Sequence, residues 1–527
     1  MGSEKVNTEK FDDLKSQISR LNQIGIALSS EHNLDKLLEL IVKEALSFTD
    51  ADGGSLYIRE NDKLNFLVAQ SQSLERHATG KPSFKSFYVP LTKESISGYV
   101  AITGEVLNIP DVYHMPPTVE YRFNKDFDVK MGYRSKSMLT VPMRDHNDET
   151  IGVLQLVNSM DRSGNVVPFK EDYESLILSL ASQAAVAIRN ANLIQEIRNL
   201  FRSLVRYSAK AIDSRSPHTA GHSGRVAKYA VRMAESLNEI KEGSLAQYKF
   251  SSEQIEELRM CGWLHDIGKI GVKEAVLEKT TKLNEAEMET ICQRFETIKA
   301  SHVIRAQRQK LELAMSSRDE GALRQEVEAR LQEELKALDA DLELLRRVNV
   351  PGYVPADDLK RLREIAERTY LNTNSEPCYF LTKHEYENLR VTPGNLTPAE
   401  YKEIQSHVRH TLAILDKIPF TKDLENIPKY AASHHEKLDG SGYPLGLKGE
   451  AIPLQSRILC IADIYDALSS PDRPYKKAIP LEKSLQILRE EAAAGKLDAD
   501  LVDLFIQRKL YQGQRVTEDR DDEDERD

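Results

Sequence analysis

The sequence predicts a multidomain chain, in which an α+β domain is joined by a long helix to an all-α domain with a helical insertion. Its 527 residues are too many for one ordinary hydrophobic core. Short β-branched runs separated by turn residues occupy residues 53–158, which is typical of an antiparallel sheet. From residue 173 onward, apolar residues recur instead at helical spacing.

The α+β part is predicted to begin with helices. Residues 1–29 form an N-terminal helix in this interpretation, because apolar residues recur at helical spacing within it, and residues 34–48 form a second helix. The strand-like runs that follow cover residues 53–61, 63–71, 87–91, 106–112, 137–145 and 150–158. We therefore expect an antiparallel sheet with flanking helices.

Together with the segment SISGYVAITGEVLNIPDVY, these runs resemble a GAF domain, an α+β fold that senses small molecules. On the family's usual extent the domain covers residues 30–192, and the resemblance implies a small-molecule ligand of unknown identity. Asn158, Phe169 and Glu174 echo a signature of GAF domains that bind cyclic nucleotides. Because the lysine and the aspartate of that signature are replaced here, we interpret the three residues as structural.

Residues 173–213 are predicted to form one long connecting helix, because apolar residues run along it and Gly and Pro are absent. Such an apolar seam is either buried within the chain or forms a dimer interface. GAF domains linked to an effector domain usually dimerise. The resemblance therefore favours a homodimer formed through helices 8–28 and 173–213.

The second half of the chain carries a series of histidine and aspartate motifs. In order they are HTAGHSGRVAKYA, LHDIGKIGV, a helix with His407, HHEKLDGSGYP, ADIYDAL and DRPYKKA. Imidazole and carboxylate groups without thiolates suit Fe, Mn or Zn and not a soft metal. In content and order these motifs resemble the HD-GYP domain, the cyclic di-GMP phosphodiesterase branch of the HD metallohydrolases. The resemblance spans residues 203–490 and implies an all-α domain.

The resemblance implies a metal centre with seven protein ligands, which are His222, His265, Asp266, His407, His434, His435 and Asp463. Members with three ions carry a glutamate where this chain has His218. Two divalent ions, Fe or Mn, are therefore favoured, and His218 would be a ligand only of a third. The implied reaction is attack by a metal-bound hydroxide that opens cyclic di-GMP to pGpG, with further cleavage to GMP left open.

Three residues are expected to act in this reaction. Asp266 would bridge the two ions, and Lys269, one turn beyond it, would contact a phosphate oxygen. Asp466, one turn from Asp463, is a candidate to assist proton delivery to the leaving 3′-oxygen.

Other residues are expected to hold the substrate. Arg473 and Lys476 would form the basic pocket that an anionic dinucleotide needs in a chain with a net charge of −11. Gly442 and Tyr443 would build a tight loop beside the metal centre, with the Tyr443 ring available for base stacking.

The sequence also predicts the ends of two helices that carry ligands. Thr397, Pro398 and Glu400 predict that the helix of His407 opens with a capping box. Gly268 is expected to end the preceding ligand helix in the manner of a C-cap.

Two similar segments, residues 282–294 and 395–407, stand where the family has one. Only the second ends in histidine, because Arg294 occupies the corresponding place in the first, so His407 is taken as the ligand and residues 295–390 as an insertion. Leucines spaced four and three apart predict an amphipathic, coiled-coil-like helix within it. We expect a helical hairpin packed on the side of the domain, with an arm that docks a partner as the alternative.

Composition excludes several classes of protein. The net charge of −11 argues against a nucleic-acid binder, and four cysteines without a CxxC pair argue against a disulfide framework or a zinc ribbon. No apolar run approaches the roughly 20 residues that span a bilayer, and no signal peptide is recognised, so a cytoplasmic protein without membrane contact is expected. Residues 491–527 are predicted to be a C-terminal helix followed by a disordered acidic tail.

Two other functions stay open at this point. The chain could be a catalytically silent receptor for a cyclic dinucleotide, or a phosphodiesterase for another one, such as cyclic GMP-AMP. The GYP loop disfavours nucleoside triphosphates, on which some plain HD enzymes act.

Overall fold

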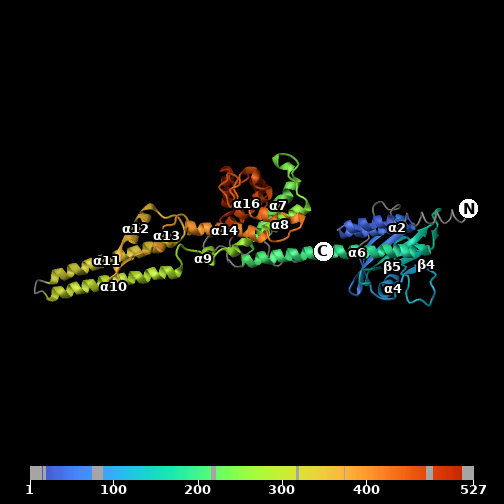
Figure 1. Cartoon of the computed structure of the whole chain (residues 1–527), viewed down its shortest axis with the longest axis horizontal. Coiled ribbons are helices and arrows are strands. Elements are labelled where there is room, and N and C mark those ends of the chain that lie inside the picture. The colour runs from blue at the N-terminus through green and yellow to red at the C-terminus, as the bar shows by residue number, and fades with distance from the viewer. Residues whose placement is uncertain are drawn as a thin grey trace. The chain divides into compact units, whose positions relative to one another are not determined.

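A computed structural model describes residues 15, 19–31, 33–73, 87–214, 221–315, 320–372, 374–470 and 479–512. The chain divides into two compact units, which are Met1–Phe201 and Arg202–Asp527 (Figure 1). Each unit is described by itself below. Among the described residues, no helix is both long and apolar enough to cross a bilayer.

Unit 1 is built on an antiparallel sheet. Its strands are β1 (Ala51–Glu60), β2 (Lys63–Ser71), β3 (Phe87–Pro90), β4 (Leu107–Ile109), β5 (Met138–Arg144), β6 (Thr150–Met160) and β7 (Val166–Val167). The strand order is β3-β2-β1-β6-β5-β4, with β7 paired to β6. The six predicted strands are thus confirmed, and β7 is an addition too short to produce an alternating pattern.

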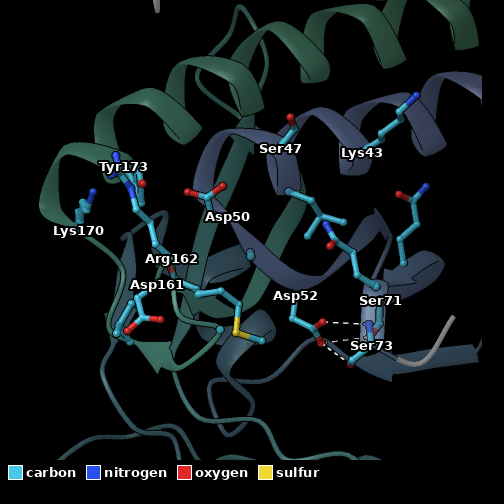
Figure 2. A pocket seen from close by; sticks show the side chains of 18 of the residues that line it. Lys43, Ser47, Asp50, Asp52, Ser71, Ser73, Asp161, Arg162, Lys170 and Tyr173 are labelled. Atoms are coloured by element: carbon cyan, nitrogen blue, oxygen red, sulfur yellow. Dashed lines mark hydrogen bonds between the residues drawn. The ribbon is translucent and has the colours of Figure 1, made fainter. Parts of the chain in front are cut away.

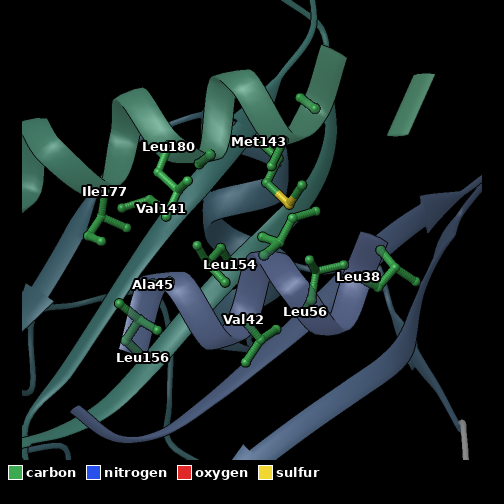
Figure 3. Close-up of a cluster of buried hydrophobic side chains, with 14 of the residues drawn as sticks. Leu38, Val42, Ala45, Leu56, Val141, Met143, Leu154, Leu156, Ile177 and Leu180 are labelled. Atoms are coloured by element: carbon green, nitrogen blue, oxygen red, sulfur yellow. The ribbon is translucent and has the colours of Figure 1, made fainter. Parts of the chain in front are cut away.

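Helices cover both faces of this sheet. α2 (Leu34–Thr49) and the start of α6 (Glu171–Asp213) pack on one face, where they share an apolar core with Leu56 and Leu154 (Figure 3). The neighbouring residues Tyr57 and Val153 point to the opposite face, as the alternation of side chains along a strand requires, and pack with α4 (Ile96–Thr103). A short helix, α5 (Asp126–Met131), completes the unit among its described residues.

The N-terminal helix is described in part, and residues 19–30 are helical. Its Ile24 and Leu28 are buried in the core that α2 and α6 share. Leu14 and Ile18, which complete the predicted apolar face, lie outside the described residues. The described part of that face is therefore occupied within unit 1.

The residues that echo a cyclic-nucleotide signature have structural partners, in agreement with our interpretation. Asn158 is buried, and its side chain accepts a hydrogen bond from the backbone of Lys136 and donates one to the carbonyl of Arg134. Glu174 accepts a hydrogen bond from Asn108, and Phe169 lies in the core.

Unit 2 carries the end of α6 and is predominantly helical. Outside the insertion its helices are α7 (His222–Glu239), η1 (Ser244–Gln247), α8 (Ser252–Leu264), η2 (Ile267–Gly271), α9 (Glu274–Leu277), α14 (Pro398–Leu415), η3 (Lys422–Leu424), α15 (Ile427–Ala431), η4 (Gly449–Ala451), α16 (Leu454–Ser469), α17 (Leu481–Ala493) and α18 (Ala499–Gln507). α7 packs on α8 and α16, while α14 packs on η2 and α15. The elements that carry the predicted metal ligands are therefore neighbours in space.

The insertion folds around a core of its own. Its first helix, α10 (Glu285–Met315), begins before the predicted start at residue 295, and α11 (Glu320–Asn349), α12 (Ala356–Glu367), β8 (Thr369–Leu371), β9 (Pro377–Tyr379) and α13 (Lys383–Leu389) follow. α10 and α11 form the predicted hairpin, and the described members of its apolar cluster all lie between Leu283 and Leu389. The expectation that the hairpin packs on the side of the domain is therefore wrong, because its leucines face other parts of the insertion. Lys282 and Leu389 meet at its base, where the Lys282 ammonium donates a hydrogen bond of 3.2 Å to the Leu389 carbonyl.

Candidate metal centre

The seven predicted metal ligands converge from five segments of unit 2. His222 begins α7, the pair His265 and Asp266 follows α8, and His407 lies in α14. The other three ligands are His434 and His435, just after α15, and Asp463, on α16. The imidazole rings are close neighbours, because ring centroids are 4.0 Å apart for His434 and His435, and 4.8 Å apart for His265 and His434.

Two carboxylates lie among these rings. Asp266 has one oxygen 3.3 Å from Nε2 of His407 and the other 3.2 Å from Nε2 of His265. Asp463 has one oxygen 3.3 Å from Nε2 of His222 and the other 3.8 Å from Nδ1 of His435. Each carboxylate therefore faces histidines from two different segments, which is the geometry that a bridging ligand needs.

Backbone carbonyls fix the tautomer of three of the histidines. Nδ1 of His265, His407 and His434 lies 2.8, 2.6 and 2.5 Å from the carbonyl oxygen of the residue three positions earlier. A carbonyl oxygen only accepts hydrogen bonds, so each Nδ1 carries the proton. In the neutral ring the lone pair is then on Nε2.

Those Nε2 atoms fit a metal site. The Nε2 atoms of His265, His407 and His434 are buried, and none has a hydrogen-bond partner among the described residues. A buried polar atom without a partner is costly unless something else binds it. The ligand atoms also fall into two groups, His407 with His434 and His435, and His222 with His265 and Asp266, each within 4.8 Å. This arrangement fits the binding of divalent metal ions.

The protonation states of three histidines and of Asp463 suit metal binding. Burial lowers the pKa of His407, lowers that of His434 further, and lowers that of His435 to about 4, so these rings are neutral at physiological pH. Burial works against ionisation of Asp463 as well, but the neighbouring histidines outweigh it and hold its pKa well below the usual value. The carboxylate is therefore charged.

Close packing places His407 beside His265. A Cβ added at Gly268 would lie 2.0 Å from the His407 carbonyl oxygen, so only glycine allows α14 to approach η2 this closely. Thr411 joins the two segments, because its hydroxyl accepts from the Gly268 amide at 3.0 Å and donates to the His265 carbonyl at 3.0 Å. The C-cap expected at Gly268 is wrong, since its φ is not positive. The predicted capping box of α14 is confirmed.

Asp466 lies behind the ligands. It is 1% exposed, and its carboxylate accepts hydrogen bonds from Nδ1 of His222 at 2.7 Å and from Nε of Arg225 at 2.7 Å. Burial alone would raise the pKa of Asp466, but these two hydrogen bonds outweigh it and the pKa is lowered. An ionised carboxylate is a poor proton donor. The sequence analysis did not single out Arg225, although it lies one turn after His222.

Lys269 and the glycine-rich loop flank the centre. The Lys269 ammonium lies 2.6 Å from Asp266, and its side chain is partly exposed. The Tyr443 ring stacks beside the His435 imidazole, with centroids 4.8 Å apart. A Cβ at Gly442 would lie 2.4 Å from the backbone nitrogen of Lys437, so the loop closes tightly on itself there.

Glu436 holds this loop, and the sequence analysis did not identify it. Its buried carboxylate accepts hydrogen bonds from the amides of Leu445 and Leu447, at 2.7 and 2.9 Å. Because Glu436 directly follows the two ligand histidines, the loop is tied to the metal centre. The sequence indicates a role for Glu436 only through its position in the run HHEKLDGSGYP.

Three predicted residues, His218, Arg473 and Lys476, lie outside the described residues. Arg294, which replaces histidine in the first of the two similar segments, lies in α10, directly before the predicted insertion. It donates to both carboxylate oxygens of Glu385, at 2.7 and 3.0 Å. The first segment therefore supplies a structural ion pair, whereas the second supplies His407.

Unit 1 contains a groove with both signs of charge. Its volume is about 1510 Å³, and it lies between the end of α2, the start of α6 and the β6–β7 turn (Figure 2). Lys43, Arg162 and Lys170 line it together with Asp50. Asp52 is held at one side by the backbone amide of Ser73, at 3.0 Å.

Comparison with known families finds a GAF domain at residues 33–188 and an HD domain at residues 219–342 and 384–501. These matches confirm the predicted order of a GAF domain followed by an HD-type helical region. Residues 343–383, between the two HD matches, fall within the insertion.

Curated relatives match parts of the chain. It is 46% identical over 99 residues to the 3′3′-cGAMP-specific phosphodiesterase 3 of Vibrio cholerae, covering 19% of this chain and 20% of that protein. It is 35% identical over 152 residues to the 3′3′-cGAMP-specific phosphodiesterase 1 of the same organism, covering 27% of this chain and 34% of that protein. Identity to the cyclic di-GMP phosphodiesterase of Thermotoga maritima is 36% over 121 residues, covering 23% and 32%. The chain thus spans between 20% and 34% of the length of these relatives.

Proposed function

We propose that this chain, a GAF domain followed by an HD domain, is a metal-dependent phosphodiesterase that hydrolyses cyclic di-GMP to linear pGpG. The observation that carries the proposal is the set of five imidazoles and two carboxylates around buried Nε2 atoms. The names of the curated relatives place cyclic dinucleotides first among candidate substrates. GMP is a second product to be tested.

Two divalent ions, Fe or Mn, are the proposed cofactors, because both accept imidazole and carboxylate ligands. His407, His434 and His435 would hold one ion, and His222, His265 and Asp463 the other, with Asp266 between them. When bound, such ions supply Lewis-acid chemistry, which lowers the pKa of water and stabilises the charge that develops at phosphorus.

The chain's own side chains would position the reactants. Lys269 is proposed to contact a phosphate oxygen, because its ammonium lies at the partly exposed edge of the site beside Asp266. Asp466 is proposed to orient His222, and this replaces the proton-donor role expected from the sequence, since its carboxylate is committed to His222 and Arg225. Carboxylates that hold a ligand histidine in this way fix its tautomer and ring orientation.

The glycine-rich loop is proposed to flank one base of the substrate. The Tyr443 ring lies against His435, so a base stacked on Tyr443 would lie next to the metal centre. Arg473 and Lys476 are proposed to bind phosphate on the basis of sequence alone. The alternative substrate is cyclic GMP-AMP, in line with the names of two of the relatives.

The proposal is tested by turnover of the full chain. Protein purified without oxygen is analysed for metal, loaded with Mn²⁺ or Fe²⁺, and incubated with cyclic di-GMP and with cyclic GMP-AMP, separately and in competition. We expect linear product from cyclic di-GMP, and its loss in a His434→Ala variant. The matched control is His384→Ala, because His384 is an exposed histidine paired with Glu287 at 2.9 Å.

The outcomes separate the candidate functions. Faster turnover of cyclic GMP-AMP would move the substrate to that dinucleotide. Tight binding of a cyclic dinucleotide without turnover, with every metal tried, would show that the chain is a receptor and not an enzyme. Equal activity in His434→Ala and wild-type protein would contradict the proposed centre.

We also propose that the chain forms a homodimer through α6, whereas the described apolar face of the N-terminal helix, expected to take part, is occupied within unit 1. Leu193, Ile197 and Leu200 lie on α6 at spacings of four and three and are exposed, as a coiled-coil seam requires. Leu200→Glu is expected to shift the mass measured by light scattering from dimer to monomer. A wild-type protein that is monomeric at micromolar concentration would refute the dimer.

The GAF domain is proposed to bind a small molecule. The groove of unit 1 offers lysines and an arginine beside a carboxylate, which suits a small charged ligand. Screening small charged metabolites for a rise in the thermal unfolding temperature tests this, with Lys43→Ala as the groove variant. A hit that binds Lys43→Ala unchanged would place the ligand elsewhere.

A further inference from the structure

The last residue of α6 reaches the first turn of α7. Asp213 is 4% exposed, and one of its carboxylate oxygens accepts the backbone N–H of Ser223 at 3.1 Å. Its other oxygen accepts the Ser223 hydroxyl at 3.0 Å. Ser223 is the second residue of α7, directly after His222. One carboxylate therefore joins the end of one helix to the start of the next.

This contact satisfies a need of α7. The first backbone N–H groups of a helix lack partners within it, and a side chain at the N-cap usually binds one. The N-cap of α7 is Gly221, whose φ is 68° and which has no side chain to do so. Asp213 takes that role from outside the helix, and a negative charge at a helix N-terminus is favourable.

The anchored turn also carries a metal ligand. His222 begins α7, and its Nδ1 lies 2.7 Å from Asp466 of α16. Arg225, in the same turn, donates to Asp466 and to the Ser470 hydroxyl, at 2.7 and 2.9 Å. The first turn of α7 is thus held on one side by Asp213 and on the other by α16, which also provides Asp463.

We infer that Asp213 is a positioning residue, through which the C-terminal end of α6 holds His222 in place for metal binding. The inference rests on the proposed function, because it assigns His222 to the metal centre. In the chain, the GAF domain is followed by α6, and Asp213 is the last residue of this helix. The geometry of the metal centre therefore depends on the end of the helix that follows the GAF domain.

Substitutions in the full chain test the inference. Asp213→Ala removes both acceptor oxygens, Asp213→Asn keeps one, and Ser223→Ala removes the hydroxyl donor only. The matched control is Asp128→Ala in unit 1, because Asp128 is also buried and accepts the amide and the hydroxyl of one serine, Ser135, both at 2.8 Å. For each variant we would measure Mn²⁺ affinity by calorimetry, kcat and KM, and the thermal unfolding temperature.

We expect Asp213→Ala to bind Mn²⁺ about tenfold more weakly and to lose kcat by a similar factor, as when groups that orient metal ligands are removed. KM should stay within about twofold, since both carboxylate oxygens of Asp213 are bonded to Ser223. Asp213→Asn should recover part of both losses. Asp128→Ala should lower thermal stability while Mn²⁺ affinity and kcat stay at the wild-type values.

Wild-type Mn²⁺ affinity in folded Asp213→Ala and Ser223→Ala proteins would overturn the inference. If Asp213→Ala does not fold, the Mn²⁺ affinity of Ser223→Ala decides. Ser223→Ala is expected to fold, because it retains the backbone hydrogen bond to Asp213. A wild-type protein that binds Mn²⁺ but hydrolyses no cyclic dinucleotide would refute the proposed function. The Mn²⁺ measurements would still test Asp213 in that case.

Discussion

His265, His407 and His434 each use the same local device. Each ring donates its Nδ1 proton to a carbonyl three residues earlier in its own turn of chain. The geometry is short-range, so the orientation of each ring is set within its own turn of chain. His222 differs, because a carboxylate from α16 fixes its ring instead. It therefore depends most on tertiary packing.

Replacing Asp466 with asparagine tests that dependence. Asp466→Asn removes the charge that balances Arg225 and weakens the hydrogen bond to His222. We expect Mn²⁺ affinity and kcat to fall by about 10- to 100-fold. The control is Asp341→Asn, because Asp341 is equally buried and is bonded by Arg361 and Arg368 far from the ligands in sequence. Equal Mn²⁺ affinity in the two variants would contradict the role of Asp466.

Lys282 provides a prediction about pH. Its side chain is fully buried, and burial lowers its pKa from 10.5 to about 8. Because the pKa is lower in the folded state, folding releases a proton between these two values, and stability rises with pH across that window. Lys282→Met should therefore raise the unfolding temperature of the insertion near pH 7, and by less near pH 10. A difference that does not change with pH would refute this account of Lys282.

At this scale, the sequence could predict the proposed ligands, which the structure brings together, but not the hydrogen bonds that hold them in place. The seven ligands lie in motifs with a fixed order, so resemblance is sufficient to find them. Arg225 and Asp466 are separated by 241 positions, and no local pattern links the two. Asp213 and Glu436 were missed for a related reason, because each binds backbone amides, which leave no trace in the sequence.

The helices and strands followed from periodicity where they are long and amphipathic. The six predicted strands and the helices at α2, α6 and α14 lie close to their expected positions. The misses are short elements, namely β7 and the β8–β9 hairpin, whose two or three residues hold too few side chains to form a pattern. Gly268 was assigned to a turn, whereas packing between η2 and α14 requires it.

That packing gives a prediction for the helix pair. Gly268→Ala would force α14 away from η2, because the new Cβ would lie 2.0 Å from the His407 carbonyl. We expect a loss of about 3 kcal/mol or more in stability, together with loss of Mn²⁺ binding. Gly321→Ala is the control, since it lies in α11 with no atom within 4 Å of the added Cβ. It should gain about 0.5–1 kcal/mol. Normal Mn²⁺ binding by Gly268→Ala would argue against the packing described.

Across the whole molecule, the metal centre joins segments that are widely separated in the chain. Removing the ions with a chelator should therefore destabilise unit 2 and leave unit 1 unchanged. For free Mn²⁺ at about 100 times its dissociation constant, the expected loss is about 2.7 kcal/mol. Hydrogen exchange followed by mass spectrometry gives the protection of each unit separately. Equal loss of protection in unit 1 would contradict this independence.

The contact between Lys282 and Leu389 has a practical consequence. These residues are 107 positions apart, yet a hydrogen bond joins them at the base of the insertion. Because the two ends of this segment lie side by side, a foreign domain with adjacent termini could be inserted at the same position. A fluorescent protein placed there instead of the insertion would be attached to unit 2 at both of its ends.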